Sequence, residues 1–410
     1  MLSGLRVLDL TDEKGFICGK ILAELGADVI KIEKPGGDPA RNIGPFYQDT
    51  IDPEKSLYWF AYNSSKRGIT LNIQLDLGTE LFKKMASTAD IVIESFPPGY
   101  MDSLGLGYQE LSEINPEVIV ASITPFGQTG PYRDYQASDL SLMALSGITS
   151  ISGYPDRAPL RLCLEQSYCL SGTHAAIGIM NAIYYRRRFD VGQYIDVSMY
   201  ECLALANSID PVTWECTKQL LGRVGDRLMG QARQVWRCKD GYITWTLMGG
   251  EDEIKLLKGL IERMDEENMA GFLKSLDWSS VHISELSLEQ IKLYEEVIAA
   301  FFLKHTKKEL EQLSQEKNLR LAVIHDIDDV AEGDQLSSRQ LASRGYWKDV
   351  FYPELCTTIK SPGFLFLSTE TQTQVRFRAP LIGEHNDEIY EKELCLSKEE
   401  ISQLKKQGVI

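Results

Sequence analysis

The chain has 410 residues, 43% of them hydrophobic and 25% charged, which is the composition of an ordinary globular protein. Its 59 acidic and 43 basic residues give a formal net charge of −16, so nucleic acid and anionic membranes are not expected as main partners. The length exceeds that of a single ordinary core, and two or three domains are expected.

Two further features of the sequence narrow the function. An apolar strand pattern begins at residue 5 without a basic leader or a long apolar run before it, which favours a cytoplasmic location. The eight cysteines include no Cys-x-x-Cys pair and the five histidines are scattered. We therefore expect reduced thiols and no metal site.

Short β-branched runs alternate with amphipathic stretches through the first half of the chain. The pattern predicts strands over residues 5–10, 28–33, 90–94, 118–123 and 194–197, and helices over residues 15–25, 78–89 and 172–188. Such alternation predicts an α/β fold, with a mostly parallel sheet covered by helices on both faces.

The second half of the chain follows a different pattern. Residues 234–245 predict a hairpin, with positive φ at its Asp240-Gly241 turn. A charged region over residues 251–315 has apolar residues at helical spacing. Strands are predicted again over residues 321–325 and 374–380.

A last helix is predicted over residues 398–407, because Ser397 and Glu400 have the spacing of a capping box. The change of pattern along the chain predicts the domain organisation. We expect a large domain built from residues 1–220 and 326–410, and a smaller α+β domain over residues 221–325.

The N-terminal unit reads as strand, turn, helix and strand, but no Gly-x-Gly-x-x-Gly follows its first strand. An NAD cofactor is therefore not expected. Farther along, Lys66 and Arg67 stand just before a predicted strand, where two cations at a sheet edge would suit a phosphate group. The alternative interpretation is a pair of ordinary surface charges.

Residues 162–199 are the most informative segment of the chain. A helix rich in small residues begins near Gly172, carries Arg186, and leads through Gly192-Gln193 into a strand at residues 195–198. This arrangement resembles the class III CoA-transferases, such as the formyl-CoA and carnitine CoA-transferases. Similar blocks follow the family's order at residues 63–71, 89–106, 126–139 and 378–386, so the resemblance covers nearly the whole chain.

The resemblance implies a Rossmann-like large domain built from both termini, a smaller middle domain and two interlocked subunits. It also implies acyl-CoA and a carboxylic acid as substrates, with no metal. By the same resemblance, CoA would be contacted by Lys34, Arg41, Lys66, Phe96 and Met199. The alternative for the cations is a solvated surface, and for Phe96 and Met199 a place in the core.

The family's catalytic aspartate stands four residues before the glycine that matches Gly172, and that position is Tyr168 here. The reaction needs a carboxylate that attacks the thioester and forms a mixed anhydride. A phenol stays protonated near neutral pH and forms no anhydride. Glu165, about one helical turn away, and Asp139 are the nearest acids that would compensate.

Three interpretations of this loss remain. The chain is the inactive subunit of a heteromeric transferase of the benzylsuccinate type, whose partner chain carries the nucleophile. Alternatively it is active alone through a relocated carboxylate, or it is a CoA-binding homologue without activity. The racemase branch of the superfamily is disfavoured, because Ser138 stands where those members have histidine.

The acids exchanged are not identified by the sequence. Four aromatic residues hint at an aromatic-lined cavity, and equally at an ordinary core: Tyr168, Trp236, Tyr242 and Trp245.

Overall fold

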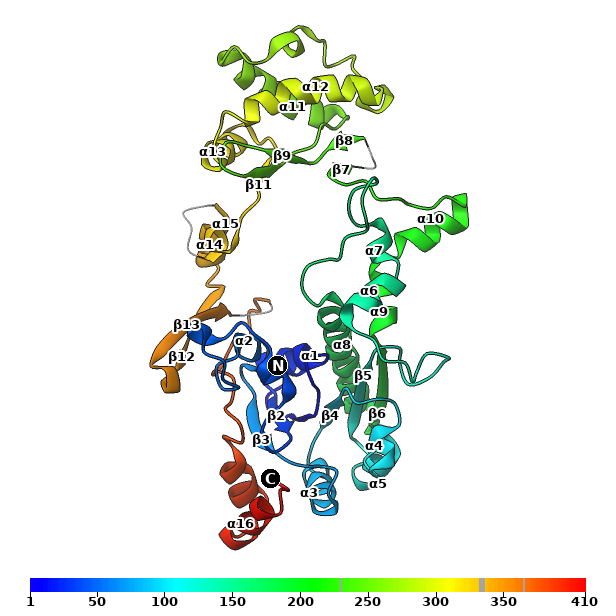
Figure 1. Ribbon diagram of the computed structural model, residues 1–410, viewed down its shortest axis with the longest axis vertical. Coiled ribbons are helices and arrows are strands. Elements are labelled where there is room, and N and C mark those ends of the chain that lie inside the picture. Colours follow the sequence, from blue (N-terminus) through cyan, green and yellow to red (C-terminus); the bar gives the residue numbers. More distant parts are fainter. Residues whose placement is uncertain (229–230, 332–335, 364–365) are drawn as a thin grey trace. The chain divides into compact units, whose positions relative to one another are not determined.

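The computed structural model describes residues 1–228, 231–331, 336–363 and 366–410. Two units can be distinguished (Figure 1). The first unit combines Met1–Thr149, Arg161–Leu220 and Gly345–Ile410, so both ends of the chain contribute to it. The second unit consists of Ser150–Leu160 and Leu221–Arg344.

A six-stranded sheet organises the first unit, and each neighbouring pair of strands is parallel. Its strand order is β3-β2-β1-β4-β5-β6, that of doubly wound nucleotide-binding folds. The strands are β1 (Arg6–Asp9), β2 (Asp28–Glu33), β3 (Arg67–Thr70), β4 (Ile91–Glu94), β5 (Ile119–Thr124) and β6 (Gln193–Ser198). The predicted α/β class and parallel sheet are therefore confirmed.

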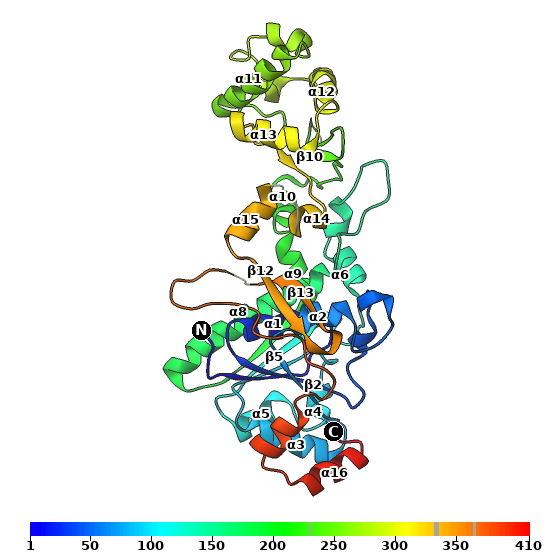
Figure 2. The same ribbon diagram turned by 90° about the vertical axis from the view of Figure 1, so that its left-hand side faces the viewer.

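Helices cover both faces of this sheet (Figures 1 and 2). One face packs on α1 (Phe16–Glu24), α8 (Gln166–Phe189) and α9 (Met199–Ala206), and the other on α3 (Asp76–Ala86), α5 (Tyr108–Ile114) and α16 (Lys398–Lys406). Successive strand residues alternate between the two cores, as Val7 and Leu8 do. The strands are apolar on both faces because both faces are covered.

Shorter elements complete the first unit: α2 (Leu57–Asn63), α4 (Tyr100–Ser103), α6 (Asp139–Leu145), α10 (Ile209–Thr217), β12 (Trp347–Tyr352) and β13 (Thr357–Pro362). Helix α7 (Ile148–Ile151) lies where the chain leaves this unit. Helix α16 has the expected capping box, in which Ser397 accepts from the Glu400 amide and Glu400 accepts from the Ser397 amide. The prediction of this last helix is confirmed.

The second unit is a smaller α+β body with its own core. Its helices are α11 (Glu251–Glu266), α12 (Leu288–Phe302), α13 (Lys307–Lys317), α14 (Ile327–Ala331) and α15 (Leu336–Ser343). Its strands are β7 (Arg227–Leu228), β8 (Ala232–Arg233), β9 (Val235–Arg237), β10 (Tyr242–Thr244) and β11 (Ala322–Val323). The predicted hairpin is confirmed as the antiparallel pair β9–β10.

Two local predictions were wrong, and one hairpin was not predicted. Neither Asp240 nor Gly241 has positive φ, because the turn takes four residues and closes when the Cys238 amide donates to the Gly241 carbonyl. Residues 374–380 form no strand, since their backbone groups bond to the separate partners Glu24, Gly363 and Ser65 rather than along a ladder. The hairpin β12–β13 was missed altogether.

Helix α8 packs very closely on α1 at Gly172. This contact sets the position of Tyr168, which lies one turn earlier in α8. A Cβ on Gly172 would lie 2.9 Å from Ile17 Cβ and 3.1 Å from the Cys18 nitrogen. Any side chain there would push α8 away, since one of these neighbours is backbone.

We expect Gly172→Val to lower the free energy of unfolding by about 1–3 kcal/mol through overpacking at this contact. Thr173→Val places the same side chain at the adjoining exposed position and should change it by less than about 0.5 kcal/mol. Urea unfolding of the two variants measures the difference. Equal losses in both would show that the α1–α8 contact is not tight.

Within the described ranges, none of the helices combines the length and the apolar character needed to cross a membrane.

Candidate functional site

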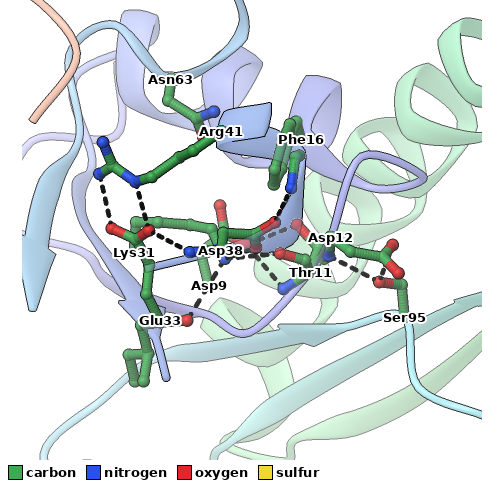
Figure 3. Close-up of polar contacts among 12 residues, drawn as sticks. Asp9, Thr11, Asp12, Phe16, Lys31, Glu33, Asp38, Arg41, Asn63 and Ser95 are labelled. Atoms are coloured by element: carbon green, nitrogen blue, oxygen red, sulfur yellow. Dashed lines mark hydrogen bonds and ion pairs between the residues drawn. The ribbon is translucent and has the colours of Figure 1, made fainter. Parts of the chain in front are cut away.

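The topological switch point of the sheet lies between β1 and β4, where the strand order reverses. Ligands of open α/β sheets bind outside the carboxyl ends of the strands at such a point. The loops after β1 and β4 are tied together there: the Asp12 amide donates to Ser95 Oγ (2.9 Å), and Ser95 Oγ donates to Asp12 Oδ1 (2.8 Å) (Figure 3). This point is therefore the place to look for a site.

Lys66 lies in the interior next to this loop, with no solvent exposure. Its ammonium donates to Asp9 Oδ2 (2.9 Å), to Asn63 Oδ1 (2.9 Å) and to the Phe16 carbonyl (3.1 Å). An ammonium has three donors, and all three are used. The predicted contact of Lys66 with CoA is corrected here, because this group is a structural ion pair.

Arg41 is also buried, and four partners surround its guanidinium. It pairs with Glu33 through Nε (2.6 Å) and Nη2 (2.8 Å) (Figure 3). Its Nη1 pairs with Glu54 (2.8 Å). It also donates to the Pro380 carbonyl (3.0 Å) and lies 3.8 Å from the centre of the Trp59 ring. Arg41 therefore joins the N-terminal and C-terminal segments, and its predicted phosphate contact is corrected in the same way.

The other three predicted CoA contacts differ in accessibility. Met199 is fully buried in the core beneath α8, so its predicted contact is also corrected. Phe96 is half-buried, with its ring 4.7 Å from that of Tyr100. Lys34 is exposed at the start of its loop. Of the five residues, Lys34 and Phe96 alone present surface to a ligand.

Tyr168 lies in the first turn of α8 and is half-buried. Burial, with smaller contributions from the nearby carboxylates of Glu13 and Asp139, raises the pKa of its phenol to about 12. Tyr168 is therefore a neutral hydrogen-bond donor at neutral pH. The structure brings it close to Glu13, a residue of the loop after β1 that the sequence analysis did not consider.

Two tyrosines of α2 belong to the same cluster. Burial raises the pKa of Tyr58, with further contributions from Glu165 and Glu13, and burial raises the pKa of Tyr62, with Cys169 and Glu165 adding to it. No spacing in the sequence connects α2 with the start of α8. The site around Tyr168 is thus lined by protonated phenols and carboxylates.

The comparisons with known proteins agree with this geometry. The model of CoA-transferase family III matches residues 2–386. This chain belongs to CoA-transferase family III. The predicted resemblance is confirmed.

Two relatives and one solved structure show how far the similarity extends. The chain is 33% identical to the BbsE subunit of succinyl-CoA:(R)-benzylsuccinate CoA-transferase from Thauera aromatica, over 94% of this chain and 93% of the relative. It is 30% identical to the succinyl-CoA–D-citramalate CoA-transferase of Chloroflexus aurantiacus, over 100% and 98%. A CAIB/BAIF family protein from Brucella suis has a TM-score of 0.82 at 25% identity, over 95% and 98%.

For a family III member, the availability of a carboxylate decides the chemistry. Asp139 is almost fully buried, and its Oδ1 accepts from the Ser167 amide (2.9 Å) and hydroxyl (2.7 Å). Arg161 approaches its other oxygen (3.4 Å). Asp139 thus accepts hydrogen bonds at the N-terminus of α8, and its candidacy as nucleophile stays a prediction.

Glu165 immediately precedes α8 and makes no capping bond. It is half-buried, and its charge raises the pKa of the Cys169 thiol, although burial is the main cause of that shift. Cys169 therefore stays a thiol. Glu13 and Asp12 are half-buried carboxyl groups whose charges act on Tyr168. The candidacy of Glu165 stays a prediction.

Besides Tyr168, the three aromatic residues predicted for a substrate cavity belong to the second unit. Trp236 and Trp245 are buried in the core of the second unit, with ring centres 5.8 Å apart, and Tyr242 is exposed there. His385 has a structural role, since its Nδ1 accepts from the Gly68 amide (3.1 Å). None of these four residues belongs to the Tyr168 cluster.

Proposed function

We propose that this chain is one subunit of a cytoplasmic, heteromeric CoA-transferase that moves CoA from an acyl-CoA donor such as succinyl-CoA to a carboxylic acid. The observation that carries this proposal is the cluster at the start of α8. Tyr168 stands there at the position that the resemblance assigns to the family's carboxylate, and Asp139 accepts hydrogen bonds from Ser167. A homologous partner chain would supply the nucleophile.

In the complete enzyme, a carboxylate oxygen of the partner attacks the thioester carbon and the C–S bond breaks, which gives a mixed anhydride and CoA thiolate. The thiolate then attacks the enzyme's acyl carbon and releases the donor acid, leaving CoA on the enzyme as a thioester. The acceptor acid takes over that CoA by the same two steps. In this chain, Lys34 and Phe96 are the accessible residues for contact with CoA.

Two observations support a partner chain. The relative from Thauera aromatica is itself named a subunit. Helix α8 also carries a second apolar stripe on the side away from its own sheet, with large side chains that are 37–62% exposed: Ile177, Met180, Tyr184, Tyr185 and Phe189. A helix that is apolar on both sides is typical of one that packs against another chain. Interlocking of the two chains is part of the proposal.

The second candidate is a transferase that is active alone, with Glu165 as its nucleophile. It is favoured by the position of Glu165 at the open end of α8, without a capping bond. Because reacting groups must be placed to within about 1 Å, a displacement by one helical turn counts against it. The third candidate is a CoA-binding homologue without activity.

The test is an assay of CoA transfer from succinyl-CoA to a panel of carboxylic acids, with this chain alone and mixed with a co-encoded homologue. Borohydride trapping and peptide mapping locate the carboxylate that forms the enzyme thioester. We expect transfer only in the mixture, with the modified residue on the partner chain.

The controls separate the three candidates. Glu165→Gln should leave the activity of the mixture unchanged if the partner carries the nucleophile. Transfer by this chain alone, with modification at Glu165, would refute the heteromer. If the chain binds CoA but no mixture shows transfer, the result would support the third candidate, a CoA-binding homologue without activity.

A further inference from the structure

A cavity of the first unit lies on the sheet face covered by α4 and α5, which is opposite to the face covered by α8. It has a volume of about 250 Å³. Its floor is formed by three neighbouring strands, through Glu94 of β4, Ser122 of β5 and Tyr194 of β6. Residues of α4 and α5 form its wall. The cavity can therefore hold a small organic molecule.

Glu94 is the acid at the base of this cavity, and only 4% of it is exposed. Its Oε2 accepts from the Phe96 amide (2.7 Å), and Ser122 donates to the same carboxyl group. The hydroxyl of Tyr194 in turn donates to Ser122 Oγ (2.9 Å). The hydroxyl groups of Tyr194 and Ser122 thus form a series of hydrogen bonds that ends at Glu94, the final acceptor.

Among the described residues, no basic side chain forms an ion pair with Glu94. A buried carboxyl group without a cation is uncommon, because ionising it away from water is costly. Burial, together with the charges of Asp12 and Asp102, raises the pKa of Glu94 to about 7 against the opposing effect of its hydrogen bonds from Ser122 and Phe96. A positive group entering the cavity would relieve that cost.

The rest of the cavity suits a positive group that carries an apolar body. Asp102 adds a second acid to the lining, and the rings of Tyr108 and Tyr194 lie 5.6 Å apart. Aromatic faces attract cations. Arg133, the basic residue of the lining, is exposed and already contacts Asp134 (3.1 Å).

We propose that this cavity binds a small organic ammonium ligand, whose N–H groups donate to Glu94 and whose carbon skeleton packs against Tyr108 and Tyr194. Such a ligand differs in charge from CoA and from the carboxylic acids of the proposed reaction. The cavity adjoins the loop of Phe96, an accessible residue for contact with CoA, but the proposed binding of an ammonium group does not depend on the proposed function.

Isothermal titration calorimetry on the full chain tests this, with benzylamine as the probe. Benzyl alcohol and benzoate are the matched neutral and anionic probes. We expect saturable binding of benzylamine, at least tenfold tighter than that of benzyl alcohol, and no binding of benzoate. Equal binding of benzylamine and benzyl alcohol, binding of benzoate alone, or no saturable binding at millimolar benzylamine would overturn the proposal.

Variants assign the site. Glu94→Gln keeps the size of the side chain and should weaken benzylamine at least tenfold, whereas Glu113→Gln, an exposed acid of α5, should have no effect. Tyr194→Phe keeps the ring and should weaken binding severalfold, which serves as a second reading if Glu94→Gln fails to fold. Unchanged affinity in both cavity variants would place the ligand elsewhere and refute the site.

A last comparison distinguishes two sources of the ammonium group. Phenylglycine carries the same ammonium group beside a carboxylate. The oxygens of that carboxylate would accept hydrogen bonds from Arg133 of the lining. Tighter binding of phenylglycine than of benzylamine, lost in Glu94→Gln, would assign the site to amino acids. Tighter binding of benzylamine than of phenylglycine, with both weakened in Glu94→Gln, would assign the site to simple amines.

Discussion

A Lys66→Met variant is expected to lose about 3–5 kcal/mol of unfolding free energy, because it leaves the carboxylate of Asp9 buried without its cation. Both residues of the pair have no solvent exposure, and their charged atoms are 2.9 Å apart. Asp9 would retain its hydrogen bonds from the Thr11 amide (3.0 Å) and hydroxyl (2.6 Å). Urea unfolding at neutral pH measures the loss.

The pH dependence of this loss has a defined sign. Burial tends to raise the pKa of Asp9, yet Lys66 and Lys31 hold it below its ordinary value. In the wild type, the stabilisation from Asp9 is present above the carboxyl's unfolded pKa and is lost only as the pH falls through the lower folded pKa. In the variant the pKa of Asp9 rises, so protonation of this carboxyl group should reduce the deficit as the pH is lowered from 8.

Lys34→Met is the matched control, because Lys34 is exposed. It should change the free energy of unfolding by less than about 0.5 kcal/mol. Adding Asp9→Asn to Lys66→Met should recover part of the loss, since the buried charge is then removed. A loss in Lys66→Met no larger than in Lys34→Met would show that the ion pair is not buried in solution.

Tyr168→Asp is expected to give the chain a carboxylate that succinyl-CoA can acylate, where the wild type has none at this position. The new side chain would lie in the first turn of α8, one turn before the tight contact of Gly172 with α1. Incubation with succinyl-CoA followed by borohydride and peptide mapping should find modification at position 168. The wild type should show none there.

Tyr168→Asn is the matched control, because it has the same size as the aspartate variant but cannot form an anhydride. We expect slow turnover in the aspartate variant, since Glu13 and Asp139 lie near enough to raise the pKa of a carboxyl group there. Modification in the asparagine control would mean that another residue reacts. If neither variant is modified although both still bind CoA, the site around α8 has lost more than its nucleophile.

Local signals in the sequence were sufficient for most of the first unit. The run Asp28–Glu33 is β-branched and apolar and became β2 with the predicted bounds. The Ser397/Glu400 pair placed the start of α16 correctly, because a capping box is completed within one helical turn. The hairpin β12–β13 escaped prediction, and its strands are buried at few positions.

The site was less accessible to sequence reasoning. Tyr168 was recognised from its spacing to Gly172, but its neighbours Glu13, Tyr58 and Tyr62 come from the loop after β1 and from α2. Cations were assigned to CoA from their motifs alone. The partner that decides the role of Lys66 is Asp9, 57 residues away in the chain.

The sequence by itself determined the fold class and the family, because periodicity and motif spacing are properties of neighbouring residues. Tertiary structure decided which charges are buried. Lys66 and Arg41 form interior ion pairs, whereas Lys34 is exposed. It also brought Glu94, Ser122 and Tyr194 together from three strands. Burial and ion pairing depend on distances through space, which the order of residues along a chain does not fix.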